Sequence, residues 1–78
     1  MNARECRIRW GAFLRELTRD TEHLSAAAFK CKYGIDVREG RAARKRFREL
    51  ADAGKGDDNE EVRTLLGLFA AMRDRNAN

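Results

Sequence analysis

Apolar residues recur every three or four positions along most of this 78-residue chain, and this spacing constrains the fold more than any other feature. It places side chains on one face of an α-helix, whereas a half-buried β-strand needs strict alternation. The one β-favourable pair, Ile35 and Val37, stands alone. The sequence therefore predicts an all-α protein, with residues 1–78 forming a single small domain that is a bundle of four helices.

The first predicted helix covers about residues 3–19, with Asn2 as its N-cap. Its apolar stripe consists of Cys6, Trp10, Phe13, Leu14 and Leu17. Ile8 lies roughly opposite this stripe, as single exposed apolar residues often do. Residues 19–23 break the pattern, so we expect a connector there.

The second predicted helix is short and is bounded by two clear signals. Ser25 is a natural N-cap for a helix over residues 26–33. Gly34 is the left-handed residue expected just past the end of that helix. A tight turn is therefore expected before the third helix begins.

The third predicted helix begins at Asp36, with Glu39 placed to complete a reciprocal capping box, and reaches about residue 53. Its inward face is expected to comprise Ala43, Phe47, Leu50 and Ala51. Gly40 lowers local helix stability by roughly 1 kcal/mol relative to alanine. The same glycine would let a neighbouring element approach closely.

The last predicted helix has two alternative caps, Asp57 with Glu60 or Asp58 with Glu61. Its wide apolar stripe consists of Val62, Leu65, Leu66, Leu68, Phe69 and Met72. The tail is expected to fray from Asn76 onward. A chain of this length obtains only a few kcal/mol from helix packing, so a partner subunit would add needed stability.

We therefore expect a homodimer whose contacts involve Leu65, Leu68 and Met72. Cys6 and Cys31 are the only thiols, and we interpret them as small buried hydrophobes in a reducing compartment. A single bridge between these two cysteines stays open as an alternative.

Charge is strongly segregated along the chain, although the formal net charge is only +4. Residues 30–48 contain eight basic and two acidic side chains, a local net of +6, whereas residues 49–61 have a local net of −5. On the third helix, Arg38, Arg41, Lys45 and Arg48 fall within an arc of roughly 80°, with Arg44 at its edge. Such a row repels itself unless an anion lies against it, so it indicates either a phosphate-contacting helix or pairing with the protein's own acids.

Residues 25–53 have the layout of a helix-turn-helix, in which the second helix enters the major groove. In that interpretation Val37, Arg38, Arg41 and Lys45 lie towards the bases. Lys30, Lys32, Arg44 and Arg48 would then contact phosphates. The pattern departs from the motif at Lys30, where a small residue is usual.

Several other classes are disfavoured by the sequence. His23 has no nucleophile beside it, the acids of residues 57–61 lack calcium-loop spacing, and the chain supplies too few Cys and His ligands for structural zinc. We therefore predict no enzyme activity, no metal and no cofactor. The longest nearly apolar run, residues 65–72, is far shorter than the roughly 20 residues that span a bilayer. A cytoplasmic protein without membrane contact is expected, since charges occupy the start of the chain where a signal peptide needs apolar residues.

The sequence thus predicts a small basic nucleic-acid-binding protein with a regulatory role, a dimer that binds double-stranded DNA. Its arginine-rich and alanine-rich composition suggests a bacterial or phage source. The alternative is a protein-interaction module, such as a small phage or mobile-element inhibitor that docks on an acidic or nucleic-acid-binding host protein through its two charge patches. A purely structural, self-assembling protein is a third interpretation.

Overall fold

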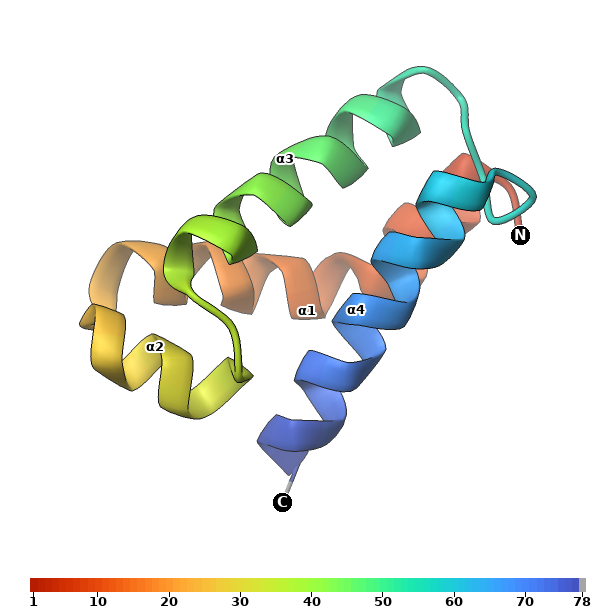
Figure 1. Ribbon diagram of the computed structural model, residues 1–78. Helices are drawn as coiled ribbons and strands as arrows, with labels where there is room; N and C mark the ends of the chain where they lie inside the picture. Colours follow the sequence, from red (N-terminus) through yellow and green to blue (C-terminus); the bar gives the residue numbers. More distant parts are fainter. Residues whose placement is uncertain (78) are drawn as a thin grey trace.

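The computed structural model describes residues 1–77, and over that range it contains four α-helices and no strand (Figure 1). In chain order these are α1 (Ala3–His23), α2 (Ala26–Tyr33), α3 (Val37–Asp52) and α4 (Glu60–Ala77). The all-α prediction is therefore confirmed. None of the helices in this range is long and apolar enough to cross a bilayer.

The predicted caps of the first two helices are present. The side chain of Asn2 accepts a hydrogen bond from the backbone N–H of Glu5 at 2.9 Å. Ser25 Oγ accepts one from the N–H of Ala28 at 3.1 Å. Gly34 has a φ of +78°, the left-handed conformation that glycine adopts without strain. These local signals fix where α1 begins and where α2 begins and ends.

The predicted connector at residues 19–23 is wrong, because α1 continues through His23. The apolar pattern stops there because the residues that α1 buries in this turn are polar. Asp20 and Thr21 are both buried, and each has a hydrogen-bond partner that makes burial tolerable. Periodicity of apolar residues alone could not detect this last turn.

The reciprocal capping boxes predicted for the last two helices are wrong, although the predicted N-cap position of α3 is confirmed. Asp36 is the N-cap of α3 but makes no side-chain capping bond, and its carboxylate lies 3.3 Å from Lys30 Nζ. Asn59, rather than an aspartate, caps α4 by accepting from the N–H of Val62 at 3.0 Å. The carboxylates of Asp36 and Asp57 pair instead with Lys30 Nζ and with the amino group of Met1.

The ends of α3 and α4 are close to those predicted. Helix α3 ends at Asp52, and Gly54 follows with a φ of +79°. The backbone of α4 is helical through Ala77, including the position where the sequence predicts fraying. Asn78 lies outside the described residues.

A cluster of buried side chains joins all four helices, and aromatic rings dominate it. Phe69 of α4 lies between Trp10, Phe13 and Phe47, with ring centroids 5.7 to 6.1 Å apart. Cys6 is buried as predicted, whereas Cys31 is exposed, and both thiols are free. The prediction that Cys31 is buried is therefore wrong, since α2 turns its other face inward.

Gly40 provides the close contact between α2 and α3. A Cβ at this position would lie 2.7 Å from Cζ of Phe29, whose side chain is fully buried. The expected close approach at Gly40 is confirmed. Its cost in helix propensity is offset by the room that it leaves for an aromatic ring.

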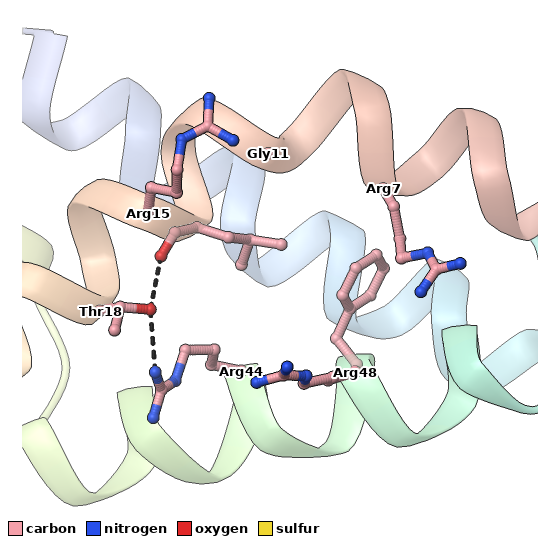
Figure 2. A pocket seen from close by; sticks show the side chains of 8 residues that line it. Arg7, Gly11, Arg15, Thr18, Arg44 and Arg48 are labelled. Carbon is pink, nitrogen blue, oxygen red and sulfur yellow. Dashed lines mark hydrogen bonds between the residues drawn. The ribbon is translucent and has the colours of Figure 1, made fainter.

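Helices α1 and α3 pack side by side and run in opposite directions (Figures 1 and 2). The contacts between them join Arg7 to Asp52 and Thr18 to Arg44. A residue further along α1 thus meets a residue earlier in α3, as antiparallel packing requires. This pairing places the basic arc of α3 beside a second row of side chains on α1.

Candidate nucleic-acid interface

The cations predicted to form an arc on α3 lie on its surface. Arg38, Lys45 and Arg48 are exposed, and none of the three forms an ion pair with any residue in the range 1–77. Their guanidinium and ammonium groups therefore have no internal counter-charge. Three cations in this state on one helix face make a surface that attracts anions.

Arg41 is also on this surface but has a structural contact. Its Nη2 donates to the backbone carbonyl of Thr21 at 2.9 Å. That carbonyl belongs to the last turn of α1, where carbonyl groups have no partner within the helix. A cation there also interacts favourably with the helix dipole. Arg41 therefore ties the start of α3 to the end of α1, besides contributing charge.

Arg44 is half-buried and bridges the two helices. Its Nη1 donates to Thr18 Oγ1 at 2.9 Å, while the hydroxyl of Thr18 donates to the carbonyl of Leu14 at 2.8 Å (Figure 2). Its Nε, in contrast, is buried and has no hydrogen-bond partner. A buried N–H without an acceptor is unfavourable by about 1–3 kcal/mol.

A groove of about 500 Å³ lies between α1 and α3 at this point (Figure 2). We call it the arginine groove, and its lining consists of Arg7, Gly11, Leu14, Arg15, Thr18, Arg44, Phe47 and Arg48. Four of these eight side chains are cationic and none is acidic. Leu14 and Phe47 supply its apolar part.

The sequence predicts the α3 side of this groove but not its α1 side. Arg7, Arg15 and Thr18 are not among the residues that the sequence predicts for the site. A usable signal was present, because residues 7, 11, 15 and 18 share one helix face, and Gly11 leaves that face open. Nη1 of Arg15 lies only 3.2 Å from where a Cβ on Gly11 would be.

Lys30 and Lys32, which the helix-turn-helix interpretation assigns to phosphates, both have carboxylate partners. Lys30 pairs with Asp36 in an exposed contact. Lys32 Nζ lies 2.9 Å from Glu16 and 2.7 Å from Asp20, and its side chain is only 28% exposed. The charge of Lys32 is thus compensated within the protein.

The two ends of α3 differ in their surroundings. A second hollow of about 470 Å³ lies where α3 begins, and Asp36, Val37, Arg38 and Glu39 contribute to its lining. The carboxylates of Asp36 and Glu39 would repel a phosphate there. Val37 packs partly against the core instead of pointing to a ligand. A helix-turn-helix protein contacts bases with this early part of its second helix. The arginine groove, nearer the other end, is the more favourable site for an anion.

The acidic residues 49–61 compensate charges outside the arc. Asp52 accepts from Arg7 at 3.1 Å, and Glu61 forms a two-point contact with Arg46 at 2.6 and 2.8 Å. Arg46 lies outside the arc on α3. Among the described residues, then, the acidic block leaves the arc cations of α3 unpaired.

The three residues predicted to mediate self-association lie largely within the protomer. Met72 is only 1% exposed. Leu65 and Leu68 are partly buried and pack against the same core. These placements make the three side chains contributors to the fold of one chain.

No group of three or more His, Cys, Asp or Glu side chains in the described part of the chain is arranged to hold a metal ion. Comparison with protein families, curated proteins and solved structures gives no match for this chain. The site must therefore be interpreted from its own geometry and charge.

Proposed function

We propose that this protein binds nucleic acid, with double-stranded DNA as its ligand and regulation as its role, through the surface formed by α1 and α3. One observation carries the proposal: Arg38, Lys45 and Arg48 are exposed, lie on one face, and have no acidic partner among residues 1–77. Nucleic acid offers a regular array of phosphates that would compensate such a row.

The dimensions support this ligand. An α-helix rises 1.5 Å per residue, so the row from Arg38 to Arg48 extends about 15 Å, close to four base-pair steps of duplex. A helix with side chains is about 10–12 Å across, which suits the major groove. Because acids flank the start of α3, we expect phosphate contacts to supply most of the binding energy and base contacts little.

A salt titration with random-sequence duplex tests the proposal. The logarithm of the binding constant should fall linearly with that of the salt concentration, with a slope of about −0.9 for each phosphate contacted. Replacing Arg38, Lys45 and Arg48 together by glutamine should make the slope shallower by up to about 3. Failure of the wild-type protein to bind duplex at low salt would refute the proposal.

Arg46→Gln is the matched control for that titration. Arg46 is on the same helix, is equally cationic, and already has Glu61 as its partner. Its replacement should leave the salt dependence of duplex binding nearly unchanged. An equal loss in this variant would mean that net charge alone, and not the arc, determines binding.

The rival function, a protein-interaction module that binds an acidic or nucleic-acid-binding host protein, has one observation in its favour. Ile8 of α1 is 70% exposed, and phosphate binding makes no use of a large apolar side chain. Recovery of one partner from a host lysate in the presence of nuclease, lost in an Ile8→Glu variant, would favour the rival.

A further inference from the structure

We infer that the arginine groove between α1 and α3 binds a single nucleotide unit, holding its phosphate with Arg15, Arg44 and Arg48 and covering the half-buried side chain of Leu14 with the attached sugar or base. This inference rests on the proposed function, because it specifies how the same surface would hold one unit of the ligand. It assigns a defined nucleotide-binding site to a surface that is otherwise only generally positive.

The charge of the lining points to a phosphate. Arg15 and Arg48 have no ion pair among the described residues, and no acid lines the groove. Arginine is the side chain best suited to this task, since its planar guanidinium donates two parallel hydrogen bonds to a phosphate. Arg7 is held by Asp52 and contributes less.

Arg44 supplies the observation that distinguishes a specific binding site from a merely charged surface. Thr18 holds one end of its guanidinium, while its Nε–H is buried without an acceptor. Native proteins rarely leave a buried donor unpaired. A phosphate oxygen in the groove would supply the missing acceptor after a small rotation of the outer torsions of this side chain.

The size and the apolar part of the lining point to more than a phosphate alone. A groove of about 500 Å³ falls within the 300–1,000 Å³ typical of small-molecule sites. One phosphate would occupy only a small part of that volume. Leu14, which is half-buried, offers apolar surface that a sugar or base would remove from water.

Arginine Nε–H signals in a proton–nitrogen NMR spectrum test this inference directly. Three probes are added separately: inorganic phosphate, deoxyadenosine monophosphate, and a short random-sequence duplex. We expect the signals of Arg44 and Arg48 to move with deoxyadenosine monophosphate, at a lower concentration than phosphate requires. Movement of these two signals with the duplex alone also supports the nucleotide-binding site and identifies the polymer backbone as the source of the nucleotide.

Two results of that titration would overturn the inference. One is an equal response of Arg38 and Arg48 to every probe, which is the behaviour of an undifferentiated positive surface. The other is a spectrum in which Arg44 and Arg48 respond to none of the three probes.

Arg48 is exposed, so we expect its replacement to leave the fold intact. Arg48→Gln should weaken deoxyadenosine monophosphate binding about tenfold, because one charge-assisted pair is lost. Arg38→Gln is the control: it belongs to the arc but not to the groove lining. Equal binding of the nucleotide by the Arg48→Gln variant and the wild-type protein would contradict the inference.

Failure of the inference and failure of the proposed function give different results. If Arg48→Gln leaves duplex binding intact while Arg38→Gln and Lys45→Gln weaken it, the protein binds duplex without using the arginine groove. If deoxyadenosine monophosphate binds at Arg44 and duplex does not bind at low salt, the groove is a nucleotide site and the proposed function is wrong.

Discussion

Two regions of α1 receive cations from the same basic segment and treat them in opposite ways. In the first, which we call the carboxylate cluster, Glu16 and Asp20 of α1 hold Lys32 and Tyr33 of α2. In the second, the arginine groove, α1 presents Gly11 and neutral or basic side chains to α3. A cation with two carboxylates serves the fold, whereas cations that meet no acid stay available for a ligand.

Contacts within the carboxylate cluster shift the pKa values of Asp20, Lys32 and Tyr33. Burial raises the pKa of Asp20, but hydrogen bonds from Lys32 and Tyr33 outweigh that effect and place its pKa below the ordinary value. Hydrogen bonds to Asp20 and Glu16 raise the pKa of Lys32. Burial, followed by the bond to Asp20, raises the pKa of Tyr33. Each group thus favours the charge state that holds the cluster together.

The largest effect is expected from Asp20→Ala, which removes the central acceptor of the cluster. It leaves the buried hydroxyl of Tyr33 without a partner and Lys32 with one carboxylate, so the free energy of unfolding should fall by about 3 kcal/mol. Urea denaturation measures this loss. Glu16→Ala is the control and should cost less than about 1 kcal/mol, because Glu16 is 42% exposed. Similar losses in both variants would break the distinction between the cluster's core and its edge.

Two glycine replacements compare the tight contact between α2 and α3 at Gly40 with the arginine groove at Gly11 of α1. Gly40→Ala would place a Cβ 2.7 Å from the buried ring of Phe29, and overpacking should outweigh the gain in helix propensity, leaving a net loss of about 1–2 kcal/mol. Gly11→Ala meets only the flexible end of Arg15, so stability should stay equal or rise by up to about 1 kcal/mol. Thermal unfolding of both variants reports the difference. Destabilisation of both by the same amount would show that the groove is as tightly packed as the α2 contact.

A pair of lysine replacements tests the comparison within the basic segment itself. Lys32→Gln should lower the free energy of unfolding by about 1 kcal/mol, because Asp20 loses its ammonium partner. Lys45→Gln should change it by less than about 0.5 kcal/mol, since Lys45 is exposed and unpaired. Duplex binding should show the reverse order. A stability loss at Lys45 would mean that the arc is structural.

The smallest effect is the alkaline loss of stability. The pKa values of Lys32 and Tyr33 are raised in the folded state, so their stabilisation is complete well below the unfolded values of 10.5 and 10.0 and declines as the pH rises through them. At pH 10 the two groups should lower the free energy of unfolding by roughly 0.5 kcal/mol. Tyr33→Phe should make this decline shallower, as urea titrations at several pH values would measure. An unchanged slope in that variant would separate Tyr33 from the cluster.

Local signals in the sequence predicted the helices well where the residues involved act alone. Asn2 and Ser25 cap the helices that follow them, and Gly34 ends α2, because a cap needs only its own side chain and the next turn. The reciprocal capping boxes predicted at Asp36 and Asp57 are absent. Their carboxylates pair instead with Lys30 of the preceding helix and with the amino group of Met1.

The candidate site could be predicted only in part for the same reason. The arc of Arg38, Lys45 and Arg48 follows from helix periodicity within one segment. The contribution of Arg15 and Thr18 depends on α1 packing antiparallel to α3, which no local pattern specifies. The compensation of Lys32 likewise depends on Asp20, a residue that the sequence analysis placed in a connector.

By itself the sequence determined that this protein is all-α and where its first three helices begin, because helix formation depends on side chains three and four positions apart. It also determined that α3 has a cationic face. Only the tertiary structure decided which cations have acidic partners, since charges separated along the chain are brought together by packing. Packing pairs Lys32 with carboxylates of α1 and so removes it from the candidate site, and it brings the groove-lining residues of α1 beside α3. The physical reason is that an ion pair acts only over a short range, so it forms only where packing brings two helices together.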